Sequence, residues 1–164
     1  MLKGDKKVIE QLNLGLKKEL TAINQYFLHS RMLEDWGVTK LAAHEYKESI
    51  EEMQHADVFI KRILLLGGLP NLQELGKLFI GEDVKEVIEC DLKLELDGIK
   101  TYRKAIQVCE EAGDYVSRDI FLTILKDEEE HADGLQTQLN LIQQIGLQNF
   151  IQLNSGPQSE GGKD

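Results

Sequence analysis

Two short stretches decide how this chain folds: Glu52-Met53-Gln54-His55 and Glu128-Glu129-Glu130-His131. In both, a glutamate and a histidine three positions apart share one face of a helix. The same face carries apolar residues at helical spacing, such as Phe59 after the first motif and Leu135 after the second. Both Glu-x-x-His motifs are therefore predicted to face the interior of a helical bundle.

The two motifs belong to an internal repeat. Glu19 precedes Glu52 by 33 residues, and Glu95 precedes Glu128 by the same 33. A shift of 76 residues also aligns the apolar positions of the two halves, so that Leu12, Leu16, Ile23 and Tyr26 match Ile88, Leu92, Ile99 and Tyr102. The repeat predicts two similar helical hairpins that face each other across an approximate two-fold axis.

Four long segments show the apolar spacing of helices: 5–35, 39–66, 83–111 and 114–145. The first and third connections are only a few residues long, so each flanking pair is expected to form an antiparallel hairpin. Residues 67–82 form a longer connection, which when extended reaches about 50 Å and matches a helix of about 42 Å. The prediction is an all-α fold, a ferritin-like four-helix bundle with one long crossover, in which the second and third helices run parallel.

We expect a single domain over residues 1–153, followed by a tail. Gly146 interrupts the fourth helix, and residues 147–153 form either a short fifth helix or a frayed end. Residues 154–164 are polar and glycine-rich and are expected to be disordered.

Composition argues against several classes of partner. Nineteen basic and 29 acidic residues give a net charge of −10, which disfavours nucleic acid and anionic membranes and favours cations. The apolar run at 63–66 is far too short to span a bilayer, so we expect a cytoplasmic protein without a membrane partner. Cys90 and Cys109 match neither a metal-binding pair nor a disulfide framework, and both are expected to be reduced packing residues.

Six polar residues occupy inward positions at one level of the predicted bundle: Glu19, Glu52, His55, Glu95, Glu128 and His131. Buried carboxylates are strongly destabilising without compensation, and two divalent cations would neutralise all four of them. Oxygen-rich ligands with one imidazole per ion suit iron or manganese, and the absence of thiolates from the set argues against structural zinc. The pattern predicts a di-iron site, and its alternative is a solvated polar layer in a looser bundle.

Other polar residues receive smaller roles. His29 and His44 lie outside the repeat and are expected at the surface or at an interface. Tyr26 and Tyr102 are matched by the repeat, and each either donates a hydrogen bond to a ligand carboxylate or packs in the core.

Beyond these arguments, the sequence resembles the bacterioferritin family over residues 1–153. The resemblance rests on Glu19 and on the segments 22–29 (AINQYFLH), 48–57 (ESIEEMQHAD), 68–73 (GLPNLQ), 114–119 (DYVSRD) and 146–150 (GLQNF). Related di-iron families fit less well. Rubrerythrins add a Cys-x-x-Cys module, animal-type ferritins lack the second Glu-x-x-His, and starvation-type ferritins place their ligands between subunits.

The resemblance implies iron storage and detoxification by a hollow homo-oligomeric shell of twenty-four subunits. Fe(II) would be oxidised by dioxygen or peroxide at a di-iron centre within each subunit, and ferric mineral would be stored inside. The six residues above would be the ferroxidase ligands, with Glu52 and Glu128 bridging the two irons and His131 able to swing and open an inward path. A bacterioferritin-associated ferredoxin would be the partner for iron release.

The family also binds haem, and the resemblance assigns its axial ligand to Met53. Because Glu52 points inward, Met53 is turned about 100° away, onto a stripe with Tyr46, Ser49, Ala56 and Ile60. A two-fold contact would cover this stripe and present two Met53 side chains to one haem b iron between subunit pairs. From the residues alone, interface packing by an adaptable methionine is the favoured alternative.

Several positions depart from the family pattern or extend it. Lys47 stands where many members have a cavity-facing histidine, so no accessory inner-surface iron site is expected there. Phe59 and Gly134 replace a tyrosine and a tryptophan, so we do not expect these positions to supply electrons. Asn149 and Gln152 match residues that line the four-fold pores of the family.

Two other functions stay open at this stage. One is a di-iron oxidase or peroxide scavenger that turns over without storing mineral. The other is a structural shell subunit whose polar layer is inert.

Overall fold

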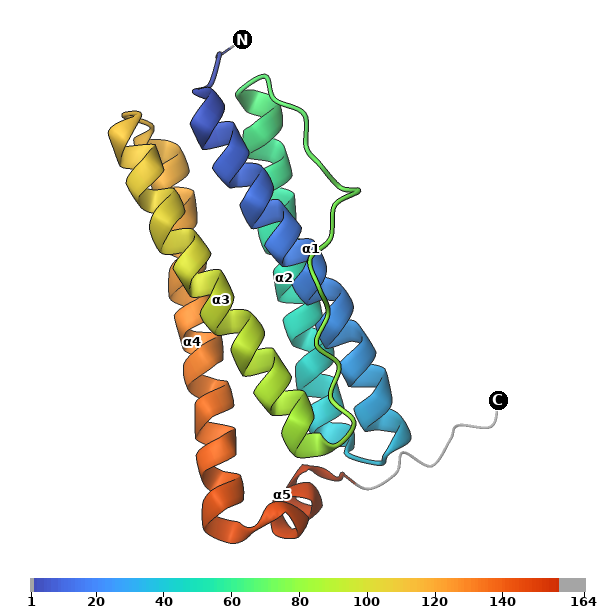
Figure 1. The fold of residues 1–164 in the computed structure, drawn as a ribbon. Coiled ribbons are helices and arrows are strands. Elements are labelled where there is room, and N and C mark those ends of the chain that lie inside the picture. The colour runs from blue at the N-terminus through green and yellow to red at the C-terminus, as the bar shows by residue number, and fades with distance from the viewer. Residues whose placement is uncertain (1, 157–164) are drawn as a thin grey trace.

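The computed structural model describes residues 2–156, and its regular elements are five helices. They are α1 (Lys6–Asp35), α2 (Thr39–Leu65), α3 (Val84–Glu111), α4 (Tyr115–Ile145) and α5 (Leu147–Asn154). The first four form an elongated bundle, and α5 lies across one end of it (Figure 1). The predicted four-helix bundle with a short fifth helix is confirmed.

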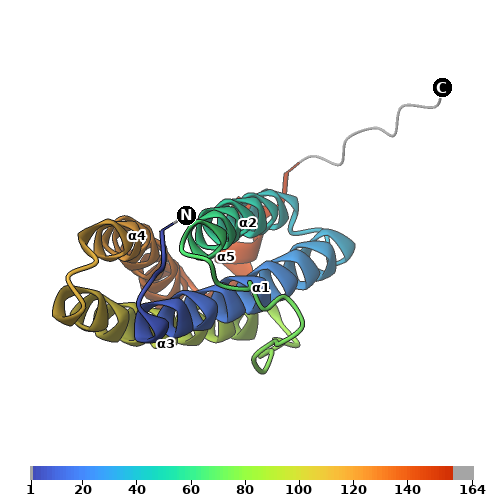
Figure 2. The same ribbon diagram turned by 90° about the horizontal axis from the view of Figure 1, so that it is seen from above.

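The segment between α2 and α3 runs along the bundle from one end to the other (Figure 1). It leaves the C-terminal end of α2 and reaches the opposite end, where α3 begins, so α2 and α3 run parallel. Seen along the bundle, the segment lies outside the helices, beside α1 and α3 (Figure 2). The single long crossover is therefore confirmed.

Side chains at every fourth position of α1 hold this crossover. We call Asn13, Lys17, Thr21, Gln25 and His29 the crossover stripe; they bond in that order to Asn71, Glu74, Gly76, Phe79 and Gly81. The Gly76 N–H donates to Thr21 Oγ1 at 2.8 Å, and the Phe79 N–H donates to Gln25 Oε1 at 3.0 Å. One face of α1 thus supplies partners that an irregular backbone would otherwise lack.

The expectation that His29 lies at the surface or an interface is wrong. Its side chain is fully buried, because the crossover covers this face of α1. Its Nδ1 lies 2.9 Å from Asp91 Oδ1, and its Nε2 accepts the Gly81 N–H at 3.0 Å. His44 has a side chain that is 49% exposed, as expected.

Aspartates begin three of the long helices. Asp5 accepts the Lys7 N–H at the start of α1, Asp83 accepts the Glu86 N–H at the start of α3, and Asp114 accepts the Ser117 N–H at the start of α4. Each carboxylate satisfies a donor that the first helical turn leaves free. At the other end of α4, Gly146 takes a φ of 83°, which separates α4 from α5.

The apolar core is divided into two main clusters by a polar layer. One cluster includes Leu12, Leu16, Ile63 and an aromatic group of Phe59, Tyr102 and Phe121, whose ring centroids lie 5.2–6.0 Å apart. The other includes Leu33, Leu41, Val87, Leu135 and Phe150. Cys109 packs in the first cluster, Cys90 is half-buried, and both are free. Phe59 therefore acts here as a core residue.

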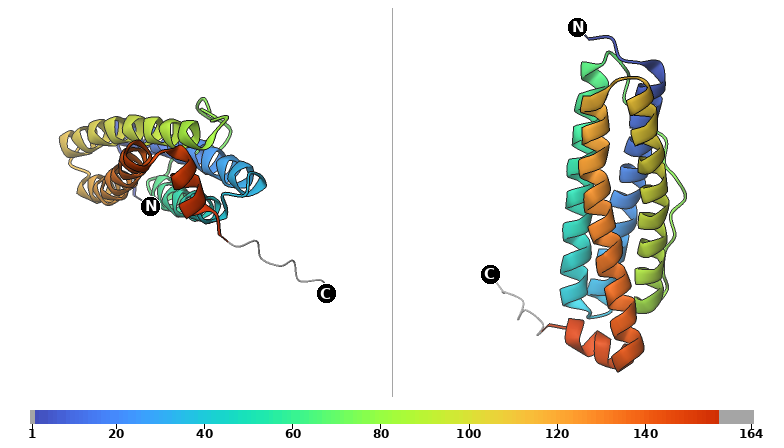
Figure 3. Two further views of the ribbon diagram at one scale, coloured as in Figure 1. Left: turned by 90° about the horizontal axis from the view of Figure 1, so that it is seen from below. Right: turned by 90° about the vertical axis from the view of Figure 1, so that its left-hand side faces the viewer.

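The short α5 closes the end of the bundle through Phe150, which is buried against the second cluster (Figure 3). Asn154 is the last residue of α5, and the Gly156 N–H donates to Thr39 Oγ1 at 2.9 Å. Most of the predicted disordered tail, residues 157–164, lies outside the described residues. No helix in the described part carries an apolar stretch able to cross a bilayer.

Candidate metal centre

The six residues predicted as ligands come together in the middle of the bundle. Glu19 comes from α1, Glu52 and His55 from α2, Glu95 from α3, and Glu128 and His131 from α4. The four glutamates are fully buried, and the two imidazoles are nearly so. Each Glu-x-x-His pair shares one inward helix face, as the three-residue spacing predicts.

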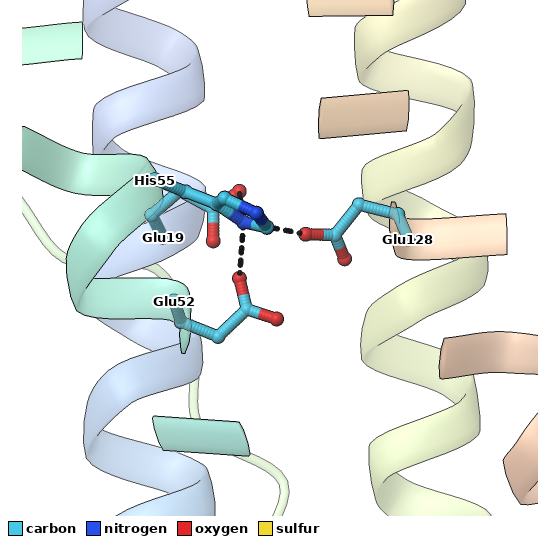
Figure 4. A group of neighbouring side chains, drawn as sticks. All are labelled: Glu19, Glu52, His55 and Glu128. Atoms are coloured by element: carbon cyan, nitrogen blue, oxygen red, sulfur yellow. Dashed lines mark hydrogen bonds and ion pairs between the residues drawn. The ribbon is translucent and has the colours of Figure 1, made fainter. Parts of the chain in front are cut away.

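The cluster divides into two groups of potential ligand atoms. In one, atoms of Glu19, Glu52, His55 and Glu128 lie within 4.8 Å of one another; in the other, atoms of Glu52, Glu95, Glu128 and His131 do. Figure 4 shows the carboxylates of the first group converging on the His55 imidazole, with Glu128 reaching it from the opposite half of the bundle. Glu52 and Glu128 belong to both groups, which is the arrangement that two bridging carboxylates require.

Several polar atoms of this cluster are buried without a well-formed hydrogen bond. They are Glu19 Oε2, Glu52 Oε1, Glu95 Oε2, Glu128 Oε1 and His131 Nδ1. All of them except Glu19 Oε2 have an ion-pair neighbour at 3.2–3.5 Å. An unsatisfied buried acceptor costs about 1–3 kcal/mol, and more when it is charged. A mixed set of carboxylate oxygens and imidazole nitrogens suits divalent transition-metal ions such as Fe(II).

Neighbouring groups fix the orientation of the imidazoles. His55 Nε2 lies 2.9 Å from Asp127 Oδ2, while its Nδ1 faces the cluster at 3.2 Å from Glu52 Oε2. His131 Nε2 lies 2.8 Å from Glu48 Oε2, and its Nδ1 lies 3.2 Å from Glu52 Oε1. A carboxylate behind a histidine is the usual partner that orients a metal ligand.

Tyr26 and Tyr102 make the hydrogen bonds that were one of their two predicted roles. The Tyr26 hydroxyl donates to Glu95 Oε1 at 2.7 Å, and the Tyr102 hydroxyl donates to Glu19 Oε1. Both rings also pack in the core. The two contacts are related by the internal repeat.

One residue that the sequence did not assign enters the cluster from α1. The Lys18 ammonium lies 2.6 Å from Glu128 Oε2 and 3.5 Å from Glu95 Oε2, and its side chain is 10% exposed. Burial opposes its charge, but the carboxylates of Glu128 and Glu19 outweigh that effect and raise the pKa of Lys18 well above its usual value. The metal-free cluster thus holds the charged ammonium of a lysine.

Burial and close charges shift the protonation of the ligands. Burial raises the pKa of Glu19 well above its usual value, and the Glu52 carboxylate adds to the effect. Burial opposes the charge of His131, yet the hydrogen bonds that its ring donates to Glu48 and Glu52 raise its pKa to about 11. Without metal the cluster therefore carries protons, which the imidazoles must release when metal binds.

The pKa of Glu128 shifts in the opposite direction. Burial would raise its pKa, but the ammonium of Lys18 and the hydrogen bond with His55 lower it far below the usual value. A carboxylate that stays ionised while its surroundings are protonated is suited to accept a metal cation.

The sequence places Glu48 in step with Glu52 and His55 on the inward face of its helix but gives it no role, and sequence reasoning missed Lys18 and Asp127. Lys18 has no counterpart in the repeat, because the matching position is Leu94. Asp127 directly precedes a ligand, so helical spacing could have indicated it.

Met53 lies away from the cluster, on the outside of α2, with 53% of its surface exposed. Tyr46 is also exposed, but Ser49 and Ala56 are buried within the subunit. The predicted stripe is thus narrower than expected, because its small residues pack against the bundle. Ile50, outside the predicted stripe, is the other large exposed apolar residue beside Met53.

The remaining predicted positions lie at the surface. Lys47 and Gly134 are exposed on α2 and α4. Asn149 and Gln152 line a surface hollow of about 620 Å³ together with Lys40.

Comparison with known proteins decides the family. The ferritin-like domain model matches residues 9–145. The bacterioferritin of Brucella melitensis is 52% identical over 159 residues, which cover 97% of this chain and 99% of that protein. The bacterioferritin of Rhodobacter capsulatus is 53% identical over 95% of this chain and 97% of its own length. The chain belongs to the bacterioferritins. Bacterioferritin BfrA of Mycobacterium tuberculosis is 48% identical over 88% of this chain and 91% of its own length.

Family membership establishes the general function of this bacterioferritin. It stores iron and is a ferroxidase, which oxidises Fe(II) to Fe(III). Iron is thus its substrate and cargo, and the buried carboxylate and histidine groups are suited to bind it.

Proposed function

We propose that two Fe(II) ions bind in the middle of each subunit, one to each of the two groups in the cluster. Glu19 and His55 would belong to one ion, Glu95 and His131 to the other, and Glu52 and Glu128 would bridge them. The observation that carries this proposal is that Glu52 and Glu128 lie in both groups while several buried oxygens of the cluster accept no well-formed hydrogen bond. Two iron ions held side by side each give one electron to dioxygen or peroxide.

The protein's part is to hold the ligands in place. Asp127 orients His55, and the two tyrosine hydroxyls orient Glu19 and Glu95. The surrounding apolar clusters keep water away from the carboxylates. Preorganised ligands of this kind accelerate electron transfer without a protein nucleophile.

His131 has a second set of carboxylate contacts, with Glu48 and Glu51. These contacts support the proposed inward route for iron past His131. His131 Nε2 lies 2.8 Å from Glu48 Oε2 and 3.0 Å from Glu51 Oε2, on the side away from the centre. Glu51 is only half-buried, so this trio leads from the centre toward solvent. We infer that His131 swings between the two sets of carboxylates as iron moves.

We further propose that this bacterioferritin assembles into a homo-oligomeric shell of twenty-four subunits in the cytoplasm and stores ferric mineral inside. The full-length similarity to three bacterioferritins supports assembly. The exposed apolar face of α2 around Met53 supports a contact between subunits. Release of the iron by a ferredoxin partner is part of the same proposal.

Haem b would bind between two subunits, with Met53 of each as an axial ligand. The exposed thioether on α2 fits this role, because a two-fold partner would place a second thioether opposite it. Bound haem would supply one-electron transfer to the stored iron.

Substitution of Glu128 tests the ligand assignment. Glu128→Ala should abolish fast Fe(II) oxidation, measured by stopped-flow absorbance, because it removes a bridging carboxylate. Glu129→Ala is the matched control, since Glu129 is exposed and forms an ion pair with the exposed Arg103 at 3.1 Å. Gel filtration should show the same assembly for both variants. Unchanged oxidation in Glu128→Ala would remove the assignment.

Iron retained per chain after aerobic loading and gel filtration separates storage from the main alternative. Hundreds of irons per chain would establish storage. About two per chain would instead support a di-iron oxidase or peroxide scavenger without mineral. A native mass near one subunit or one dimer would contradict the shell.

The haem proposal is tested with Met53→Leu. The variant should be isolated without haem, seen as loss of the Soret absorbance, and should still oxidise Fe(II). Met32→Leu, the same chemical change on α1, is the control. Stoichiometric haem in Met53→Leu would refute Met53 as the ligand.

A further inference from the structure

Lys18 places a positive charge inside a cluster whose proposed function is to bind cations. Its Nζ lies 2.6 Å from Glu128 Oε2 and 3.5 Å from Glu95 Oε2. Glu128 is a proposed bridge and Glu95 a proposed terminal ligand. The ammonium therefore occupies the carboxylates that a metal ion would need.

A glycine on the facing helix makes room for this lysine. A Cβ atom at Gly98 of α3 would lie 2.3 Å from Lys18 Cε and 2.9 Å from its Nζ. Real Cβ atoms essentially never come within 3.0 Å of another side chain. The bare backbone of Gly98 thus forms a slot through which the lysine stem reaches the centre.

The same lysine borders a hollow on the outer surface. The hollow has a volume of about 450 Å³ and lies between α1, α3 and the crossover; Lys18, Thr21, Gly76 and Asp97 line it. A displaced ammonium would be hydrated there beside the Asp97 carboxylate, although Lys17, Lys77 and Lys104 also line the hollow. Lys18 therefore has a place to go without unfolding of the bundle.

Charge balance shows why the lysine must move. Four carboxylates carry four negative charges, which two divalent ions neutralise. If the ammonium stayed, it would share Glu95 and Glu128 with the two ions and add a further positive charge beside them, which is unfavourable in a buried site. Metal binding and the inward position of Lys18 therefore compete.

We propose that Lys18 is a displaceable internal counter-ion of the iron centre. Its ammonium pairs with Glu95 and Glu128 when metal is absent, leaves them for the outer hollow when metal binds, and returns when metal departs. It lowers the affinity of the centre for metal, so that iron passes through rather than staying. This inference rests on the proposed ligand set.

Cobalt(II) titration of the assembled, iron-free protein tests the proposal without iron oxidation. Visible absorbance of bound Co(II) would give stoichiometry and affinity for wild type, Lys18→Met and Lys61→Met. We expect two Co(II) per chain in all three, with Lys18→Met binding at least tenfold more tightly. Lys61 is exposed on α2 and pairs with Asp57 on the surface at 2.6 Å, so Lys61→Met should match wild type.

The failures can be told apart. If wild type binds no Co(II), the proposed ligand set fails and the lysine proposal falls with it. If wild type binds two Co(II) and Lys18→Met binds them with equal or lower affinity, the ligand set stands and only the lysine proposal is overturned. Lys18→Gln gives the same comparison should the methionine variant not assemble.

Gly98→Ala tests the slot with the lysine retained. The added methyl group would overlap the end of the Lys18 side chain and force it to shift from its inward position, so this variant should also bind Co(II) more tightly than wild type. In the Lys18→Met background the glycine substitution should add no further affinity. Additive effects, or no effect of Gly98→Ala in wild type, would contradict the slot.

Discussion

At the scale of single residues, Tyr26 and Tyr102 make equivalent hydrogen bonds in the two halves of the internal repeat. Each phenol comes from one hairpin and donates to a glutamate of the other, from α1 to Glu95 and from α3 to Glu19. Burial raises the pKa of both phenols well above the usual value, so both keep their protons and act as donors. These bonds tie the two hairpins together at the level of the iron centre.

Removal of one phenol should loosen this connection. Tyr102→Phe leaves Glu19 Oε1 without its donor, and we expect a loss of about 1–2 kcal/mol in the free energy of unfolding. Chemical denaturation of the metal-free protein measures it. Tyr115→Phe, which alters an exposed ring, should have little effect, and equal losses in both variants would contradict the hydrogen-bond argument.

Cys109 gives a pH-dependent prediction. Burial raises the pKa of its thiol from 9.0 to about 11, so the thiol stays protonated in the folded protein at pH 9. Iodoacetamide should therefore leave Cys109 unmodified at pH 9 and react with it only after unfolding, as mass spectrometry would show. Because the folded pKa is raised, the associated stability is complete below pH 9 and is lost as the pH rises through about 11. Rapid native labelling at pH 9 would contradict this.

At the scale of elements, Asp114 joins two helices at one point. Its carboxylate accepts the Ser117 N–H at the start of α4 and the Arg62 guanidinium of α2 at 2.8 Å. Burial opposes ionisation, but the bonds from Ser117 and Arg62 together lower the pKa of Asp114. The same residue thus caps one helix and anchors its neighbour.

Loss of this cap should destabilise the bundle. Asp114→Ala removes the cap and leaves Arg62 unpaired, for an expected cost of about 2 kcal/mol at pH 7. Asp114→Asn keeps a capping oxygen and should cost less. The contribution is present above pH 3.8 and lost as the pH falls through the lowered folded pKa, so the difference between wild type and Asp114→Ala in thermal melts should shrink in acid.

The helices and the crossover were predictable from this sequence because a single physical rule determines each of them. The helices and the crossover follow from apolar spacing and connection length. His29 was misplaced because it faces the crossover, and no periodicity reports what an irregular segment covers. Lys18 was missed because the ligand pattern describes carboxylates and imidazoles, while the slot at Gly98 exists only once α1 and α3 are packed together.

At the scale of the whole molecule, the bundle encloses a charged layer between apolar clusters. Unpaired buried carboxylates weaken the metal-free fold, and a divalent ion that binds only the folded state strengthens it. The bundle and its cargo are therefore thermodynamically linked.

Metal should raise the melting temperature of the protein. At a free Co(II) concentration one hundred times the dissociation constant, we expect a gain of about 2.7 kcal/mol per site, measured by calorimetry against the same protein in chelator. The gain should be largely absent in Glu128→Ala and retained in Glu129→Ala. An equal gain in both variants would place the bound metal elsewhere.

The crossover stripe also governs where the chain can change in length. Five side chains of α1 meet successive points of the segment between Asn71 and Gly81, so one inserted residue there would put every later contact out of step. The turn at Gly113, which connects α3 and α4, is exposed and makes no such series of contacts in the described structure. Engineered insertions, such as peptide tags or fused binding loops, belong at that turn and not in the longer segment that looks more permissive.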